Sequence, residues 1–250
     1  MSITAAADLL RGARRATAFT GAGVSTASGL SDFRSPGGVW AKVDPMTVAS
    51  RSAFERRPEE FYGFYRTRLD LLARAAPNPA HRALAAMERA GRLQTVITQN
   101  VDGLHQAAGS TVVIEVHGNL REAVCTGCGM IRPIAAIRQA LEDGRLPHCP
   151  DCAAILKPNV VLFDDLLPVR AWLAAEQAAA TSDVMLIVGS SLQVYPAASL
   201  PEETLAAGGS LIIVNRERTP FDPRAAVTLH GEAAEILPAI AAALDARAAG

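Results

Sequence analysis

Residues 17–26 read TAFTGAGVST, a short run of apolar and β-branched residues followed at once by a glycine-rich turn. Such a turn directly after a strand lets backbone N–H groups approach a pyrophosphate at the start of a helix, although the same residues could form a plain tight turn. The dehydrogenase fingerprint has a third glycine where this chain has Thr26, and an acidic residue ends a second strand about 20 residues further on. That acidic strand end is missing here, so the stretch allows dinucleotide binding but disfavours hydride transfer.

Short apolar stretches rich in β-branched residues recur along the chain and alternate with segments of helical apolar spacing. The predicted strands are residues 17–20, 93–98, 112–116, 160–163, 185–188 and 211–214. The predicted helices are residues 80–90, 169–181, 197–207 and 232–246. This alternation predicts an α/β fold with a parallel sheet and helices on both faces.

Two regions interrupt the alternation. From about Leu30 to Ala76 there is no clear strand, and the segment is rich in aromatic residues, so we expect a mobile loop that leads into helices. Residues 121–157 contain all the cysteines and one short helical stretch at 134–143. We expect a small inserted module there.

Composition narrows the class of protein. The chain has 250 residues, half of them hydrophobic and a fifth charged, which indicates a globular protein rather than a disordered or fibrous one. A net charge of −1 provides no basic field for nucleic acid. The apolar runs are far below the roughly 18 residues that span a bilayer, and no signal peptide is recognisable. We therefore expect a cytoplasmic protein without nucleic-acid or membrane partners.

The cysteines have metal-site spacing. Cys125 and Cys128 form one CxxC pair, 20 residues follow, and Cys149 and Cys152 form a second pair. In a reducing compartment this spacing indicates one tetrahedral zinc ion held by four thiolates. Such a site has no open position for water or substrate, so the zinc is expected to be structural. His148 lies beside Cys149 and is expected to be a bystander.

Polar side chains follow two neighbouring predicted strands. Gln99, Asn100 and Asp102 come where one strand ends, and His117 follows the next. In open α/β sheets ligands bind at the carboxyl ends of the strands, so these groups are placed to bond sugar hydroxyls and an amide. Asn100 or Asp102 could instead cap a helix. A histidine at this edge is suited to general-base work near neutral pH.

These residues resemble the sirtuins, the NAD-dependent protein-lysine deacylases, and most closely the compact bacterial members. The matching blocks occur in family order from about residue 10 to the last helix. They are GAGVSTASGLSDFR (21–34), TQNVDGLH (98–105), VHGN (116–119), the two cysteine pairs, KPNVVLF (157–163), GSSLQVYPA (189–197) and IVN (213–215).

The resemblance implies a division of the chain. A Rossmann-like NAD-binding domain would comprise residues 1–34, 77–120 and 158–250. Residues 35–76 would form an insertion that holds the cofactor loop and the acyl pocket, and residues 121–157 would form the zinc module. Acyl-lysine proteins or peptides would enter the cleft between the domains, and the chain is expected to act as a monomer.

The resemblance also implies residue roles. His117 would be the general base and Asn100 its catalytic partner at the ribose, while Asp102 would bond the nicotinamide carboxamide. The expected NAD-binding residues are Gly21, Ala22, Gly23, Thr26, Phe33, Arg34, Gln99, Asn100, Val101, Asp102, Gly189, Ser190, Asn215 and Ala233. The implied reaction transfers the acetyl group of acetyl-lysine to ADP-ribose and releases nicotinamide and 2′-O-acetyl-ADP-ribose.

The substrate strand is expected to pair its backbone with Val160 to Phe163 on one side and with the segment around Val194 on the other. The family usually has Ile-Pro where this chain has Leu30-Ser31, which frees one backbone angle. It usually has Gly-Glu or Gly-Asp where this chain has Asp164-Asp165. If that glycine has a positive φ, Asp164 would strain the turn or crowd the substrate.

The acyl preference is open between two alignments. Family members that remove acidic acyl groups use a Tyr and, three residues later, an Arg. Tyr65 and Arg68 have that spacing, but if Phe61-Tyr62 is the aligned pair, Tyr65 falls at the arginine position. We expect deacetylation, with desuccinylation or another deacylation as the alternative. Protein ADP-ribosylation is a second alternative, and a non-enzymatic NAD-binding module is a third.

Overall fold

The computed structural model describes residues 2–246, and its centre is a six-stranded parallel sheet with strand order β3-β2-β1-β7-β8-β9. The strands are β1 (Ala16–Thr20), β2 (Thr95–Thr98), β3 (Val113–Glu115), β7 (Val184–Val188), β8 (Ser210–Asn215) and β9 (Val227–His230). The predicted parallel sheet is thereby confirmed. The four-residue edge strand β9 was not predicted, because so short a run gives no clear period.

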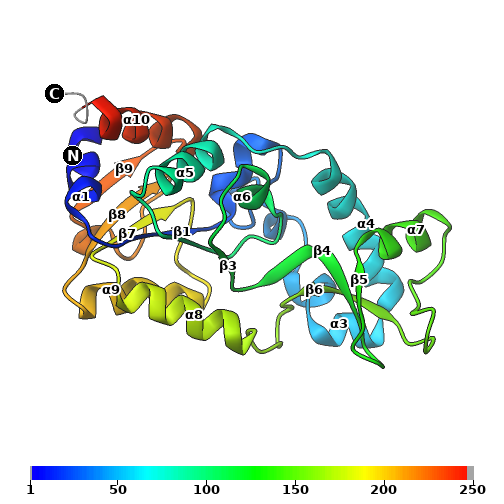
Figure 1. The fold of residues 1–250 in the computed structure, drawn as a ribbon. Coiled ribbons are helices and arrows are strands. Elements are labelled where there is room, and N and C mark those ends of the chain that lie inside the picture. Colours follow the sequence, from blue (N-terminus) through cyan, green and yellow to red (C-terminus); the bar gives the residue numbers. More distant parts are fainter. Residues whose placement is uncertain (1, 247–250) are drawn as a thin grey trace.

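Helices cover both faces of this sheet (Figure 1). One face packs against α1 (Ile3–Gly12), α5 (Pro79–Arg89) and α10 (Ala233–Ala246), and the other against α8 (Val169–Ala180) and α9 (Leu200–Ala206). Strands β1 and β7 are buried along their whole length, which explains why their sequences are continuous apolar or β-branched runs. The predicted α/β class is confirmed, whereas helix α1 was not predicted.

Helix α5 begins at a cap that also fixes the glycine turn. The side chain of Asn78 accepts hydrogen bonds from the Ala80 and His81 backbone N–H groups, and Pro79 starts the helix. The Asn78 amide also donates to Val24 O at 2.8 Å. Val24 lies in the short 3₁₀ helix η1 (Ala22–Ser28), which directly follows β1. One capping residue therefore ties the first turn of the site to the sheet-covering helix.

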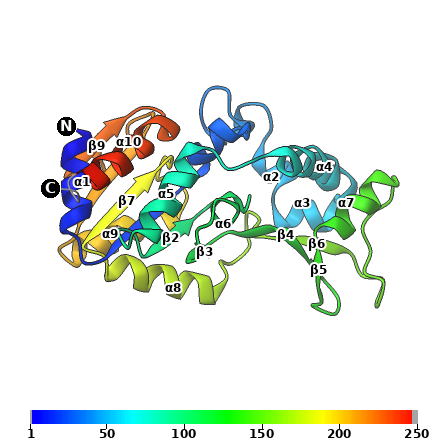
Figure 2. The same cartoon turned by 45° about the horizontal axis from the view of Figure 1, so that its top comes forward.

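A smaller unit lies beside the sheet (Figure 2). Its antiparallel sheet has the order β5-β4-β6. The unit consists of β4 (Gly118–Cys125), β5 (Ile131–Pro133), β6 (Leu156–Val160) and the helices α2 (Pro45–Val48), α3 (Arg51–Arg56), α4 (Pro58–Arg74) and α7 (Ala135–Glu142). The sheet begins before residue 121 and ends after residue 157. The proposed division into domains remains a prediction.

The expected strand at 160–163 is wrong. Strand β6 ends at Val160 and pairs antiparallel with β4 in the small sheet. The next residues form a turn in which Phe163 bonds to Ala49 and Arg51 through its N–H and C=O. In the apolar run VVLF, Val160 and Leu162 are buried in the core of the small unit, which includes Phe54 of α3, and not against the large sheet. Periodicity cannot detect this difference.

Residues 30–76 contain no strand, as predicted, apart from a single bridge between Ser50 and Phe163. Besides α2, α3 and α4, they include the 3₁₀ turn η2 (Val39–Ala41). The remaining short elements of the chain are α6 (Leu104–Ala107), η3 (Ala197–Ser199) and η4 (Asp222–Arg224). None of the helices described in residues 2–246 is long and apolar enough to span a bilayer.

Candidate active site

A cavity of about 760 Å³ lies between the carboxyl edge of the large sheet and the small unit. This size is within the roughly 300–1,000 Å³ typical of small-molecule sites. Every predicted catalytic, NAD-binding and substrate residue lines it except Tyr62. Tyr62 is buried, and its hydroxyl bonds to Leu156 O inside the small unit. Tyr65 and Arg68 do line the cavity, so of the three predicted acyl-pocket residues only Tyr62 lies outside it.

The glycine turn packs backbone against backbone. Gly23 N–H donates to Gly189 O at 2.8 Å, and Gly21 N–H donates to Val188 O at 3.0 Å. A Cβ added to Gly23 would lie 2.7 Å from the Gly189 Cα, and Gly189 itself has φ +60°. The glycines at 21, 23 and 189 are thus required where the turns after β1 and β7 meet. Their expected contacts with a pyrophosphate remain predictions.

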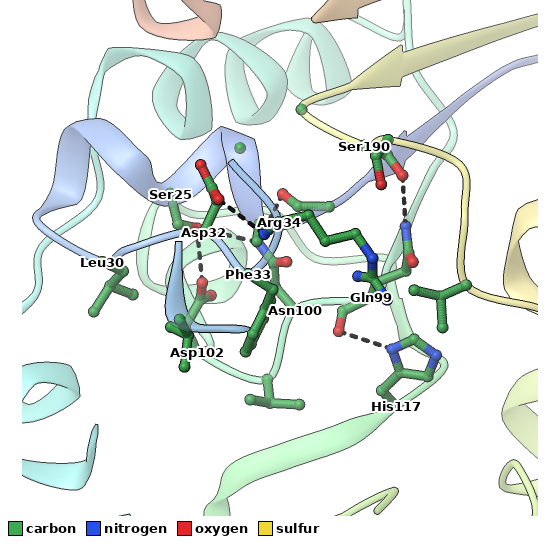
Figure 3. A pocket seen from close by; sticks show the side chains of 18 of the residues that line it. Ser25, Leu30, Asp32, Phe33, Arg34, Gln99, Asn100, Asp102, His117 and Ser190 are labelled. Atoms are coloured by element: carbon green, nitrogen blue, oxygen red, sulfur yellow. Dashed lines mark hydrogen bonds between the residues drawn. The ribbon is translucent and has the colours of Figure 1, made fainter. Parts of the chain in front are cut away.

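Asn100 and Asp102 are held in place by Ser25 (Figure 3). The Asn100 amide donates to Ser25 Oγ at 3.1 Å and to Gly21 O at 3.1 Å. The Ser25 hydroxyl donates to Asp102 Oδ2 at 2.7 Å, and Asp102 Oδ1 accepts the Leu104 N–H. Burial raises the pKa of Asp102. Ser25 was not predicted as a site residue, although it lies inside the glycine-turn motif.

Two buried histidines contact the residues that hold Asn100 and Asp102. His81 Nε2 lies 3.4 Å from Ser25 Oγ, and His105 Nε2 lies 2.9 Å from Thr20 Oγ1. Thr20 donates to Thr98 Oγ1, which accepts the Asn100 backbone N–H at 3.0 Å. The two rings meet edge to face with centroids 4.9 Å apart. Burial lowers the pKa of His81 to about 4 and that of His105 to about 3, so both rings are neutral at pH 7.

These histidines predict acid sensitivity of the fold. In the unfolded chain His81 is protonated below about pH 6.5, whereas in the folded chain its lowered pKa keeps it neutral down to about pH 4. The free energy of unfolding therefore falls as the pH falls through this interval. We expect His81 alone to reduce the free energy of unfolding by roughly 3 kcal/mol over that interval. Urea unfolding at pH 7, 5.5 and 4.5 measures the decline.

The His81→Gln variant should lose stability at pH 7 but show a shallower decline toward acid. A His148→Gln variant, which alters an exposed ring, should keep the steep decline. Equal pH slopes for the unaltered chain and His81→Gln would contradict a neutral buried imidazole at this position.

His117 lies at the turn between β3 and β4 and lines the cavity. Its Nδ1 is 3.1 Å from Gln99 O, and since a carbonyl only accepts, Nδ1 carries the proton (Figure 3). Nε2 is therefore left with a lone pair. Burial lowers the pKa of His117 from its ordinary value. The ring is thus a neutral base at pH 7.

The remaining lining groups suit a dinucleotide. Gln99 Nε2 donates to Ser190 Oγ at 2.9 Å, and Asn215 Nδ2 donates to Glu217 O at 2.8 Å, so these amides already lie at the edge of the sheet. Arg34 lines the same cavity, and burial lowers the pKa of its guanidinium. A cation among amides and hydroxyls is the donor set that a pyrophosphate and two riboses require. The residues present therefore fit NAD.

A cluster of aromatic side chains also lines the cavity. The Phe33 ring stacks on Trp40 at 5.1 Å, and Trp40 contacts Phe64 at 6.2 Å and Phe163 at 6.1 Å. The Arg68 guanidinium carbon lies 4.9 Å from the Phe33 ring centroid. Trp40 and Phe64 were not predicted as site residues. Their only sequence signal is the concentration of aromatics in 30–76.

The four cysteines converge in the small unit. Their sulfur atoms all lie within 4.8 Å of one another, with Cys125 Sγ 3.3 Å from Cys152 Sγ and Cys128 Sγ 3.8 Å from Cys149 Sγ. Tetrahedral zinc–thiolate bonds of about 2.3 Å require sulfur separations near 3.8 Å, so the cluster fits zinc. The two pairs form matching turns, in which Gly129 N–H bonds Cys125 O and Ala153 N–H bonds Cys149 O.

The turn after β6 meets the condition under which we expected strain at Asp164, namely a positive φ at a position where the family usually has glycine. Asp164 has φ +72°, in the region where glycine is favoured. Its neighbour Asp165 has a side chain only 8% exposed, which accepts from Arg51 Nε at 2.7 Å and from Lys157 Nζ at 3.1 Å. Asp165 Oδ2 also accepts the Leu162 N–H at 3.1 Å. Asp164 in place of the family's usual glycine is therefore a strained residue in the turn. Asp165 holds that turn to α3 and β6 through Arg51 and Lys157.

The parallel sheet, the cavity at its carboxyl edge and the four-thiol unit together define a class, that of α/β ligand-binding proteins with a small metal-bearing unit. A model described as the Sir2 family matches residues 21–196, which is more than half of the chain. The chain belongs to the Sir2 family.

Several known proteins are similar over nearly the whole chain. The NAD-dependent protein deacetylase of Caldivirga maquilingensis is 48% identical over 93% of this chain and 90% of its own length. The NAD-dependent protein deacylase 2 of Archaeoglobus fulgidus is 44% identical, with 95% and 94% covered. A solved Sir2 structure with a deacetylated p53 peptide and 3′-O-acetyl-ADP-ribose has a TM-score of 0.92 at 40% identity, with 96% and 97% covered.

Proposed function

We propose that this chain is an NAD-dependent protein-lysine deacetylase, which transfers the acetyl group of acetyl-lysine to ADP-ribose and releases nicotinamide. One observation carries the proposal. Asn100, Asp102 and the neutral imidazole of His117 line a single cavity at the carboxyl edge of the sheet. The names of similar proteins support the same activity, since they include NAD-dependent protein deacetylases and deacylases. The structural fit of four thiols to zinc supports a zinc-bearing member of the family.

The residues divide the work between holding and proton transfer. Bound NAD supplies a ribose carbon from which neutral nicotinamide can leave. Asp102, oriented by Ser25, would hold the nicotinamide carboxamide, and the Asn100 amide would hold the ribose. With NAD bound, Nε2 of His117 would accept a proton from a ribose hydroxyl, and that oxygen would then be a better nucleophile toward the acyl carbon. The aromatic cluster excludes water that would otherwise compete for the reactive carbon.

The dependence of nicotinamide release on substrate tests this activity. We expect purified protein with NAD to release nicotinamide when an acetyl-lysine peptide is present, and little when the peptide carries free lysine. Equal release with both peptides would contradict the proposal. Transfer of labelled ADP-ribose to protein, without an acyl-ADP-ribose product, would instead support the ADP-ribosyltransferase alternative.

Desuccinylation is the second candidate, and Arg68 favours it. Arg68 lines the cavity and lies over the Phe33 and Phe64 rings at 4.9 Å and 5.5 Å. It forms no ion pair with a carboxylate among residues 2–246. Burial lowers its pKa, which indicates that its charge is poorly solvated. A dicarboxylic acyl group would supply the missing anion.

Rates on matched acetyl- and succinyl-lysine peptides decide between the two activities. For deacetylation as the main activity, we expect a higher kcat/KM on the acetyl peptide. Replacement of Arg68 by Met should then leave deacetylation within a few fold, but should lower any desuccinylation by about 10-fold or more, because a charge-assisted pair is lost. Faster desuccinylation by the unaltered chain would overturn the preference for acetyl-lysine.

We also propose a cytoplasmic location. None of Cys125, Cys128, Cys149 and Cys152 forms a disulfide, and thiolate-held zinc is stable in a reducing compartment. The proposed partners are acyl-lysine proteins, and the near-zero net charge favours no nucleic-acid partner.

A further inference from the structure

The turn Leu162 to Asp165 has an unusual residue at its third position. Asp165 N–H bonds Leu162 O at 3.0 Å, which closes a four-residue turn with Asp164 third. A positive φ at that position favours glycine or asparagine, yet Asp164 has φ +72°. Within residues 2–246, the other non-glycine residues with positive φ are Ala153 in the second cysteine turn and Leu192. Strain held at a cavity is a reason to look for a role of the side chain.

The main chain of this turn leaves few groups for a substrate strand. Val161 N–H bonds His117 O, and Phe163 uses both its N–H and its C=O toward Ala49 and Arg51. The Leu162 N–H donates to the Asp165 side chain, and the Leu162 C=O accepts from the Asp165 N–H. Among the described residues, no hydrogen bond uses the main-chain groups of Asp164. A peptide that pairs with this turn would therefore lie directly against Asp164.

The Asp164 side chain is an exposed, unmatched negative charge at the cavity. It lines the cavity and takes part in no ion pair or hydrogen bond within the described part of the chain. The charges next to it are already balanced, since Asp165 and Glu55 pair with Arg51, and Asp165 also pairs with Lys157. Neighbouring side chains at the same edge are exposed and apolar, namely Leu166 at 91% and Val169 at 68%. No Lys or Arg side chain among residues 2–246 pairs with the Asp164 carboxylate.

We propose that Asp164 is a specificity-determining residue that selects substrates with an arginine or lysine close to the acyl-lysine. This inference rests on the proposed deacetylase function and names a feature of its substrate. Asp164 binds the flanking cation while the backbone of the substrate runs past the turn. The cation gains a single exposed partner, so the selection is modest and weakens at high salt.

A peptide series measures the selection. Each peptide differs from a common acetyl-lysine peptide at one position only. The varied positions are the two residues before and the two residues after the acetyl-lysine, and each is Arg, Gln or Glu in turn. At low salt and saturating NAD, we expect kcat/KM to rank Arg above Gln above Glu at one or more positions. Each step should be about two- to five-fold, the size of an exposed ion pair. The difference should shrink at 0.5 M NaCl, where the Debye length is only about 4 Å.

The Asp164→Asn variant isolates the charge, because asparagine tolerates the same positive φ. We expect it to turn over the Gln peptide at an unchanged rate and to lose the Arg-over-Glu preference. Asp245→Asn removes an exposed carboxylate from α10 and should keep the preference. No preference in the unaltered chain, or the same preference in Asp164→Asn, would overturn the proposal. Failure of the deacetylase function would appear differently, as no turnover even of the Gln peptide, and fluorescence anisotropy of the labelled peptides would then still measure the selection.

Discussion

Replacement of His117 by alanine is expected to lower the rate of acyl transfer by about 10²–10⁴-fold, the usual contribution of a positioned general base. The loss should fall on kcat, while the Kd for NAD stays within about two-fold of the unaltered chain. The reason is geometric. The Nδ1 of His117 is bonded to Gln99 O, so Nε2 has the lone pair that accepts a proton. The ring is not expected to contact a phosphate, so its loss should leave NAD binding unchanged. Steady-state deacetylation and calorimetric titration with NAD measure the two quantities.

The pH dependence provides an independent control on the same base. Burial lowers the pKa of His117 below the ordinary histidine value of about 6.5, so the imidazole stays neutral as the pH falls through that value. We expect kcat/KM of the unaltered chain to decline only below that pH. As a control for folding, the His117→Ala variant should unfold at the same temperature as the unaltered chain at pH 7. Unchanged turnover in His117→Ala, or loss of NAD binding together with folding, would contradict the assigned role.

Loss of one zinc ligand is expected to unfold the small unit. Structural zinc in finger-type sites contributes about 10–16 kcal/mol of binding free energy that is also folding free energy. Cys125 ends β4, and the other three thiols lie within 4.8 Å of it and of one another. We expect Cys125→Ser to bind less than one zinc per chain, to unfold at lower temperature and to lose deacetylation, because β6 leads into the Val160 to Asp165 turn.

His148→Gln is the matched control for the metal site. His148 lies beside Cys149, and its Nδ1 bonds Ala153 O rather than facing the sulfur atoms. We expect this variant to retain one zinc per chain and full activity. Undiminished zinc content and stability in Cys125→Ser would refute a four-thiolate site.

The fold class and the convergence of the site could be predicted because both follow from the parallel sheet. Gln99, Asn100 and Asp102 follow β2, and His117 follows β3, which is its neighbour in the sheet. Carboxyl ends of adjacent parallel strands meet at one edge, so polar residues there must come together. The spacing of the cysteines was sufficient to predict the four-thiol cluster for a different reason, because two CxxC turns can share one ion.

Features that depend on packing between distant segments could not be predicted. The pair of His81 and His105 forms because α5 and α6 pack side by side, which the spacing along the chain does not reveal. Tyr62 and Tyr65 lie one turn apart on α4, and helical periodicity alone cannot decide which faces the cavity. Likewise, residues 160–163 have the composition of a strand but lie largely outside one.

Mass spectrometry of the products tests the central claim most directly. With NAD and an acetyl-lysine peptide, the account predicts nicotinamide, deacetylated peptide and O-acetyl-ADP-ribose in equal amounts, with the acetyl group of an isotope-labelled peptide recovered entirely on the ADP-ribose. Free acetate formed directly, or ADP-ribose attached to protein with no acetylated sugar product, would contradict it.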